Sequence, residues 1–368
     1  MKLSFGKLRR ALQAFETYAS PRPVTLDWAV TGHCNARCVF CEAPGISAKA
    51  ALPTERMLTI VDEMAEMGVE EVLLVGGEPF IRKDLWEILA RLESRKIRVS
   101  AISNGIVISS LSSNELALLS ERGSRLSLSI DSSQKAQCDI IRGVPGIYEK
   151  LLSAIGRARE AGIRDLSLNA VIGKDNLKEI SPLIELAAQE GIPFVHFQPV
   201  SPAGIFVNQP PLPIKASFLL DDEGDIAALV AEIQRGLITA RRLGIGTDLR
   251  MFETVAVPYF KSFARKESGF YLQELVSGFR CIKAFWSGYV DYEGSLKPCA
   301  LLAHGGNIAQ KSLQSEWKNL DPLRRNFRKG RFEPDCRYCF CNAGENILAS
   351  LLAHPWQNRS LIRKLMGS

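Results

Sequence analysis

The chain has 368 residues, of which 46% are hydrophobic and 23% charged, and its formal net charge is +6. These values are ordinary for a globular protein in water, and a chain of this length buries enough apolar surface to fold without disulfides. It shows neither a secretory signal nor a run of about 18 apolar residues, so we expect a cytoplasmic protein with no membrane partner. The mild positive charge indicates a Lys/Arg surplus on the surface, and we expect no nucleic-acid partner.

Short apolar runs alternate with amphipathic helical segments up to residue 200. The predicted strands are 24–30, 71–75, 97–103, 125–130, 165–172 and 193–200. The predicted helices are 54–67, 84–95, 113–122, 146–161 and 177–190, and Thr54 and Asn114 are candidate N-caps of two of them. Strands that alternate with helices predict right-handed βα units and a parallel sheet, which either closes into a barrel or stays open.

The pattern changes after residue 200. The Pro-rich segment 201–215 predicts a boundary loop, and a helix is expected over 222–242. Residues 289–303 alternate around a Glu293-Gly294 turn, which predicts a β-hairpin. Five of the nine cysteines lie in this last part of the chain, and such cysteine use without export points to metal or redox chemistry.

Three cysteines follow the first predicted strand with the spacing C-x3-C-x2-C: Cys34, Cys38 and Cys41. In α/β folds the loops at the carboxyl ends of the strands carry the chemistry. Three thiolates can hold three corners of a cubane iron–sulfur cluster and leave the fourth iron open to a substrate or cofactor. The alternative is a zinc site that His33 or a distant residue completes.

The loop resembles the signature of radical S-adenosylmethionine (radical SAM) enzymes, with Phe40 before the third cysteine. Further motifs of the family follow in the same order: "GGEP" (76–79), "SNG" (103–105), "SIDSS" (129–133), "IRG" (141–143) and "NAVIGKDN" (169–176). The resemblance implies an α/β fold, a partial (β/α)6 barrel with a small C-terminal iron–sulfur domain made of a β-hairpin and helices. It also implies that a [4Fe-4S] cluster cleaves S-adenosylmethionine to a 5′-deoxyadenosyl radical, which abstracts a hydrogen atom from the substrate.

The resemblance implies a set of cofactor contacts: Gly76, Gly77, Glu78, Asn104, Ser129, Arg142 and Val171. The two glycines would let the backbone approach the cofactor, and Glu78 would accept from its ammonium group. Arg142 would pair with the cofactor carboxylate, unless it is an exposed surface arginine. Asp131 is expected to order its loop.

A second cysteine set resembles the auxiliary-cluster domain called twitch, a shorter relative of the SPASM domain. Its expected ligands to an auxiliary [4Fe-4S] cluster are Cys281, Cys299, Cys336 and Cys339, and a single zinc ion is the alternative. Cys341 either replaces Cys339 or is a spare thiol, with a hydrogen-atom donor as a further alternative. Cys138 is expected to be a small buried residue, with a hydrogen-atom donor as the alternative role, and His196 a core or cavity-lining histidine.

These assignments suggest five segments. We expect an N-terminal helix over 1–23, the partial barrel over 24–210 and a connecting helical segment over 211–277. The auxiliary-cluster domain would span 278–345 and a helical tail 346–368.

The function implied by the resemblance is that of a radical SAM oxidoreductase. Hydrogen abstraction would be followed by loss of an electron to the auxiliary cluster. The expected reaction dehydrogenates a sugar-like or aminocyclitol-like alcohol in a biosynthetic pathway, with flavodoxin or ferredoxin as the electron donor. The sulfatase maturases of this family carry an aspartate base directly after the cysteine that corresponds to Cys299, and here that residue is Ala300. This difference speaks against the sulfatase-maturing activity.

Two alternatives stay open. The first is a maturase that cross-links or epimerises a ribosomally made peptide, although the residues before the first strand are too few for the winged-helix module that many such enzymes carry. The second is a non-enzymatic iron–sulfur or zinc regulator. It would account for the cysteines but not for the ordered motifs between them.

Overall fold

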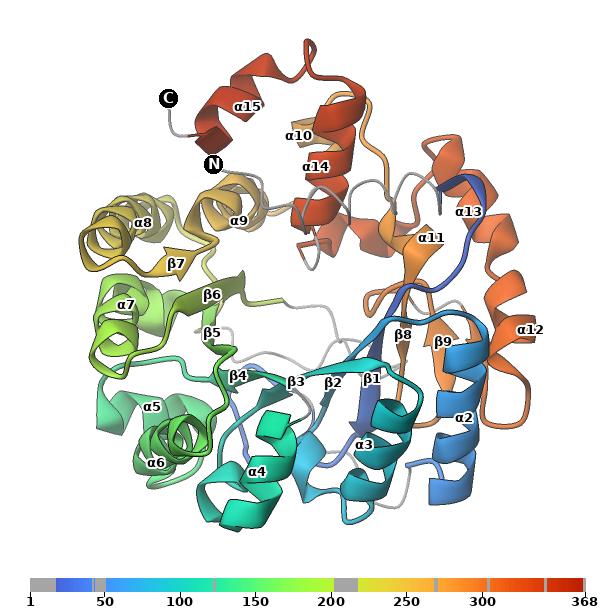
Figure 1. Ribbon diagram of the computed structural model, residues 1–368. Coiled ribbons are helices and arrows are strands. Elements are labelled where there is room, and N and C mark those ends of the chain that lie inside the picture. The colour runs from blue at the N-terminus through green and yellow to red at the C-terminus, as the bar shows by residue number, and fades with distance from the viewer. Residues whose placement is uncertain are drawn as a thin grey trace.

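One continuous sheet runs through the molecule, and Figure 1 shows helices wrapped around its outer side. The computed structural model describes residues 18–41, 43, 51–121, 124–201, 218–267, 271–302, 305–340 and 343–366. Within these residues the sheet has ten strands in the order β10-β9-β8-β1-β2-β3-β4-β5-β6-β7. The strands are β1 (Thr25–Thr31), β2 (Glu71–Gly76), β3 (Arg98–Ser103), β4 (Arg125–Ser129), β5 (Leu166–Ile172), β6 (Phe194–Pro199), β7 (Gly246–Thr247), β8 (Ser287–Val290), β9 (Ser295–Lys297) and β10 (Gly306–Asn307).

The helices of the barrel alternate with its strands. They are α2 (Thr54–Glu66), α3 (Leu85–Ser94), α4 (Ser113–Glu121), α5 (Lys135–Arg142), α6 (Ile147–Glu160), α7 (Ile180–Gln189), α8 (Glu223–Leu243) and α9 (Leu249–Ala264). The later helices are α10 (Leu272–Leu275), α11 (Lys283–Trp286), α12 (Leu313–Lys318), α13 (Asp321–Arg328), α14 (Ala343–Ala353) and α15 (Arg359–Met366). No helix among the described residues is long and apolar enough to cross a membrane.

The six predicted barrel strands are confirmed, each within one residue at either end. β1 to β6 pair in parallel, as the βα alternation requires. The predicted hairpin is also confirmed as β8 and β9, and β8 pairs in parallel with β1. The partial barrel with a C-terminal hairpin and helices is therefore correct, and the hairpin extends the barrel sheet itself.

Both predicted helix caps are wrong. α2 begins at Thr54 with Pro53 at the N-cap position, and the Thr54 hydroxyl donates to Asp84. At α4 the cap is Ser112, whose hydroxyl accepts from the Glu115 amide while the Glu115 carboxylate accepts from the Ser112 amide. A serine followed three residues later by glutamate satisfies two helix-end amides at once, which an asparagine inside the first turn cannot do.

The two faces of the barrel strands differ in chemistry. Side chains alternate between the faces along each strand. The outward set is apolar and fully buried under the helices, as at Trp28, Leu74 and Leu128. The inward set is partly exposed and mixes polar side chains, as at Asp27 and Gln198, with apolar ones, as at Leu73 and Ile102. The concave face of the sheet is therefore built to receive a ligand.

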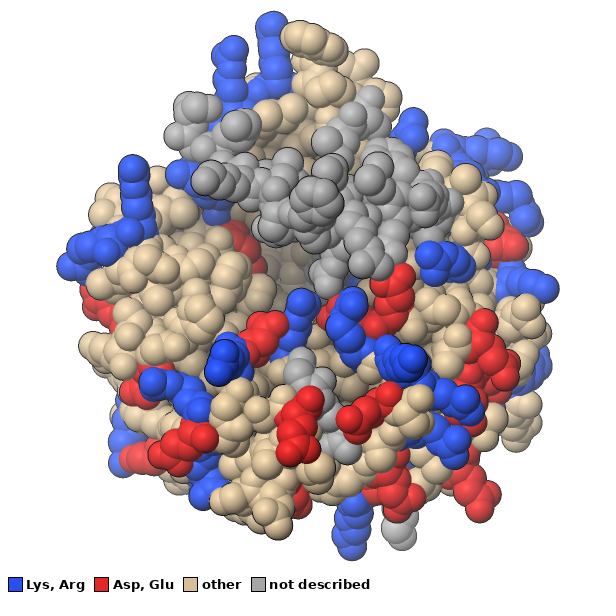
Figure 2. Space-filling model, in the orientation of Figure 1, with Lys and Arg blue, Asp and Glu red and all other residues tan. Residues whose placement is uncertain are grey.

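Two predicted segments fall largely outside the described residues. The expected N-terminal helix over 1–23 is described only from Tyr18, and the boundary loop over 201–215 only at Ser201. On the face drawn in Figure 2, acidic and basic side chains are interspersed over the lower part.

Candidate active site

The cysteine loop leaves β1 along the backbone of the "GGE" segment. The Gly77 amide donates to the Thr31 carbonyl (2.8 Å), and the Glu78 amide donates to the His33 carbonyl (2.9 Å). A Cβ on Gly77 would lie 1.8 Å from the His33 carbonyl oxygen, and one on Gly76, at φ +122°, would lie 2.2 Å from the Thr31 carbonyl oxygen. The two glycines are therefore required by the start of the cysteine loop, a nearer reason than approach to a cofactor.

Glu78 and Asn104 join the next two motifs to the same loop. The buried Glu78 carboxylate accepts from the Asn104 amide (2.7 Å), the Ser103 hydroxyl (2.9 Å) and the Phe80 amide (3.2 Å). Burial raises the pKa of Glu78 to about 7, and the hydrogen bonds oppose the shift. The Asn104 side-chain amide donates to Asn35 (2.7 Å) and to the Cys34 sulfur (3.7 Å). Glu78 thus ties β2 to β3, and Asn104 reaches the first cysteine.

The end of α5 holds the other side of the loop. The Arg37 amide donates to the Arg142 carbonyl (3.0 Å), and the Val39 amide donates to the Ile141 carbonyl (2.9 Å). Gly143 follows at φ +64°, and a Cβ there would lie 2.3 Å from the Arg37 carbonyl oxygen. The "IRG" motif therefore holds the cysteine loop in place through backbone hydrogen bonds.

Arg142 is 5% exposed, so the alternative of a surface arginine is wrong. Its Nη1 donates to the Cys38 sulfur (3.8 Å), and its Nε lies 2.6 Å from the Asp131 carboxylate. Asp131 is fully buried and accepts from the Val171 amide (2.8 Å), while Asn176 donates to the Asp131 carbonyl (2.8 Å). Asp131 therefore orders its loop as expected, and it also orients Arg142.

Ser129 and Val171 lie on the concave side of neighbouring strands. Ser129 pairs with Asn169 across β4 and β5, and Asn169 pairs with His196 on β6. Ser129 is the last residue of β4, so the row begins at the carboxyl ends of the strands. That is where ligands of such folds bind.

The three loop thiols have surroundings that suit an iron–sulfur cluster. Backbone amides donate to two of them, from Ala36 to Cys34 (3.4 Å) and from Ala43 to Cys41 (3.5 Å). Burial raises the pKa of Cys34 to about 11, so its thiolate needs a cation beside it. Among the described residues no group of three or more metal-ligating side chains is close enough together to hold a single metal ion. Hydrogen bonds to cysteine sulfurs are a regular feature of iron–sulfur sites.

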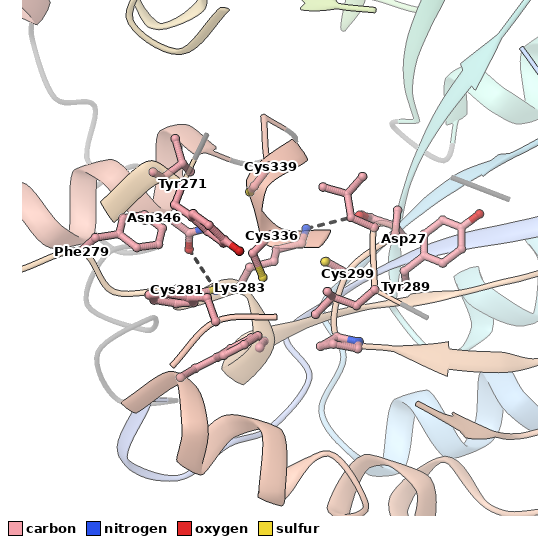
Figure 3. Close-up of a pocket in the computed structure, with 18 of the residues that line it drawn as sticks. Asp27, Tyr271, Phe279, Cys281, Lys283, Tyr289, Cys299, Cys336, Cys339 and Asn346 are labelled. Carbon is pink, nitrogen blue, oxygen red and sulfur yellow. Dashed lines mark hydrogen bonds and ion pairs between the residues drawn. The ribbon is translucent and has the colours of Figure 1, made fainter. Parts of the chain in front are cut away.

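The second cysteine set surrounds one end of a cavity of about 270 Å³. Figure 3 shows the four cysteines of this set around one space together with Lys283. They are Cys281, Cys299, Cys336 and Cys339. Burial raises the pKa of the Cys281 thiol to about 12, and backbone amides of Ala284 and Lys283 oppose the shift. Cys341 lies outside the described residues.

The other end of the cavity is the concave face of the barrel. Its lining there comes from Asp27, Leu73, Val75, Ile102 and Gln198 on four strands. The Lys283 ammonium lies 3.3 Å from the Asp27 carboxylate and so bridges the two ends. Asp27 was not among the site residues that we predicted from the sequence. A carboxylate inside the apolar run "VTLDWAV" could have indicated its place in the cavity.

Two further predicted residues differ in their surroundings. Cys138 is fully buried in the hydrophobic core, as expected for a small buried residue, and does not line the cavity. The His196 side chain is 45% exposed, so it is not a core histidine. Its Nδ1 lies 3.2 Å from the Asp248 carboxylate, which also accepts from the Phe197 amide (3.0 Å). Asp248 holds the ring from one side, and His196 is not among the residues that line the cavity.

Comparison with known proteins agrees with this geometry. Residues 28–187 match the Radical SAM superfamily, and this stretch contains the cysteine loop and every motif that contacts it. This chain is a radical SAM enzyme. Its cofactors accordingly include a [4Fe-4S] cluster and S-adenosylmethionine, and the alternative of a non-enzymatic regulator is wrong.

Relatives of this radical SAM enzyme extend the likeness beyond the barrel. The AdoMet-dependent heme synthase of Methanosarcina barkeri is 26% identical over 86% of this chain and 88% of its own length. The PqqA peptide cyclase of Granulibacter bethesdensis is 32% identical over 46% of this chain and 45% of its own. The structure of native anSMEcpe with bound AdoMet and Cp18Cys peptide matches 94% of this chain and 98% of its own, with a TM-score of 0.63 and 13% identity. The last likeness shows that the fold is shared, C-terminal hairpin and helices included.

Proposed function

We propose that this radical SAM enzyme holds its [4Fe-4S] cluster on Cys34, Cys38 and Cys41, and a second, auxiliary cluster on Cys281, Cys299, Cys336 and Cys339. The sulfur-directed amides at the first set and the shared cavity at the second support these assignments. The cofactor would lie along the concave face, against Gly77, Ser129 and Val171. When bound, these groups supply a 5′-deoxyadenosyl radical that removes a substrate hydrogen atom, and an acceptor for the electron that an oxidation releases.

The reaction we propose is oxidation of a substrate carbon. The observation that carries it is the single cavity that joins the second cysteine set to the concave face of the barrel. A substrate in that cavity would contact Gln198 and the Asp27–Lys283 pair at once. His196, held by Asp248, faces the same side of the sheet as Gln198, two residues further along β6.

The cavity also informs the substrate class. Its barrel end is mainly apolar, with Leu73, Val75, Ile102 and Tyr289 lining it together with the Asp27–Lys283 pair. Such a lining favours a small molecule with a large apolar part and few polar groups over the sugar-like alcohol that we expected from the sequence. The AdoMet-dependent heme synthase, whose name states a small-molecule product, matches 86% of this chain and supports that choice.

A peptide substrate is the second candidate. It is supported by the peptide bound in anSMEcpe, whose fold this chain shares over 94% of its length. The PqqA peptide cyclase supports it less, because that likeness covers only 46% of this chain.

Metal analysis of anaerobically reconstituted protein tests the two assignments separately. We expect about eight irons per chain, falling to about four both in a Cys34→Ala, Cys38→Ala, Cys41→Ala variant and in a Cys281→Ala, Cys299→Ala variant. The first variant should form no 5′-deoxyadenosine from S-adenosylmethionine, and the second should still form it. About four irons in the wild-type protein, with zinc making up the difference, would contradict the oxidation.

A further inference from the structure

We propose that Arg142, oriented by Asp131, sets how readily the N-terminal cluster takes up an electron, through its hydrogen bond to the Cys38 sulfur. This inference rests on the proposed function, in which Cys38 is a cluster ligand. It gives Arg142 a positioning role that is distinct from the cofactor contact implied by the resemblance.

The guanidinium has fixed neighbours on three sides. Nη1 lies 3.8 Å from the Cys38 sulfur, and Nε lies 2.6 Å from the Asp131 carboxylate. The carbon of the guanidinium lies 5.9 Å from the centre of the Phe40 ring, and Phe40 is the residue before Cys41. Arg142 is 5% exposed and Asp131 is fully buried, so water does little to screen these contacts.

The backbone holds sulfur and guanidinium together. Arg37 and Val39, the neighbours of Cys38 in sequence, donate to the carbonyls of Arg142 and Ile141. The loop therefore cannot move away from the end of α5 without breaking two backbone hydrogen bonds. A Cβ on Gly143 would collide with the same loop, which shows how closely the two segments pass.

Asp131 is as well anchored as the arginine. Its carboxylate accepts from the Val171 amide at 2.8 Å, and its carbonyl accepts from Asn176 at 2.8 Å. Those partners come from β5 and the turn after it. The carboxylate is thus fixed by the barrel, and the arginine it orients is preorganised toward the cysteine before any cofactor arrives.

Reduction adds one negative charge, part of which lies on the cysteine sulfurs. The potentials of iron–sulfur clusters depend on hydrogen bonds to the sulfurs, on net charge and on exposure to solvent. A buried cation that donates to a ligand sulfur stabilises the reduced state and raises the potential. A buried carboxylate next to that cation acts in the opposite direction. Removing the Arg142 charge and removing the Asp131 charge should therefore shift the cluster potential in opposite directions.

The test is a potentiometric titration of the reconstituted full-length protein, without S-adenosylmethionine, followed by EPR. The N-terminal cluster is identified as the signal that changes when S-adenosylmethionine is added. In Arg142→Gln we expect the equilibrium constant for one-electron reduction to fall about tenfold, which is about 59 mV lower in potential. In Asp131→Asn the side-chain oxygen can still accept from Arg142 while the negative charge is lost, so we expect the potential to rise.

Arg125→Gln is the matched control. Arg125 also forms ion pairs, with Glu71 and Asp165, but it begins β4 and so lies at the opposite end of the strand that leads to Asp131. Its loss should leave the potential unchanged. Arg142→Lys keeps the positive charge but lacks the planar set of donors of the guanidinium. Its cluster potential should lie between those of the wild-type protein and Arg142→Gln.

Unchanged potentials in both Arg142→Gln and Asp131→Asn, at full iron content, would overturn the inference. So would a weaker affinity for S-adenosylmethionine in Arg142→Gln with no change in potential, since that describes a cofactor contact only. If Arg142→Gln does not hold its cluster, the potentials of Arg142→Lys and Asp131→Asn decide instead. Unchanged potentials in both of these variants, at full iron content, would then overturn the inference. Failure of the proposed function is seen separately, as a wild-type protein with no EPR signal that responds to S-adenosylmethionine.

Discussion

Lys283 and Asp27 are 256 positions apart in the sequence, and their side chains form an ion pair with Nζ 3.3 Å from Oδ2. Asp27 lies on β1, at the centre of the sheet, and Lys283 lies two residues after Cys281. The pair therefore connects the second cysteine set to the first strand of the barrel. Lys283 is nearly buried, while the side chain of Asp27 is 20% exposed toward the cavity.

A double-mutant cycle on this pair should show coupling. Lys283→Met removes the ammonium group from Asp27, and Asp27→Asn removes the carboxylate from Lys283. The destabilisations of the two single variants should therefore sum to more than the destabilisation of the double variant. Because water partly screens Asp27, we expect a coupling of about 1–2 kcal/mol, within the usual range for contacting residues. Denaturant unfolding of the four proteins under one set of anaerobic conditions measures it. Additive effects would mean that the pair contributes nothing to joining the two parts.

Gly77→Ala should disturb the first cluster site. The new Cβ would lie 1.8 Å from the His33 carbonyl, and one of these two backbone segments must move. We expect iron per chain to fall from about eight to about four. Gly156→Ala in α6 is the control, because no atom lies within 4 Å of the Cβ it adds. Alanine there should raise stability by about 0.5–1 kcal/mol and leave the iron content unchanged.

Glu78 should make stability depend on pH. Its pKa in the folded protein is about 7, above the ordinary value of 4.5, so between these values the folded state binds more protons than the unfolded state. The free energy of unfolding should therefore fall as pH rises from about 4.5 to about 7 and be level above that range. Thermal unfolding of wild type and Glu78→Gln across this range checks the sign. The glutamine variant should lose most of this slope, and an equal slope in both would assign it to other groups.

Cys138→Ala and Cys38→Ala form a matched pair of cysteine substitutions. Cys138 is fully buried in the core, so its loss should cost about 1 kcal/mol of stability and leave the iron content at about eight. Cys38→Ala should lower iron to about four and stop formation of 5′-deoxyadenosine. Loss of substrate turnover in Cys138→Ala with full iron would instead favour the hydrogen-donor role and epimerisation.

The sequence by itself determined the barrel strands, the hairpin and the motifs around the cysteine loop. Strand and helix periodicity are local properties of the chain, and the cysteines, glycines and "IRG" lie where short segments end. That is why β1 to β6 were predicted to within one residue, and why the site was expected at the carboxyl ends of the strands. The N-cap at Ser112 could also have been predicted from the local sequence, because its partner Glu115 lies only three residues later.

Only the tertiary structure decided which distant groups meet. Gly77 is required by the backbone of His33, Arg142 is buried between Asp131 and Cys38, and Lys283 reaches Asp27 because β8 pairs with β1. His196 and Asp248 meet through the return of α9 to β6. Each of these contacts depends on strand register and on the packing of elements far apart in the chain. Local periodicity carries no information about either, because it specifies the face on which a side chain lies and not the partner that covers it.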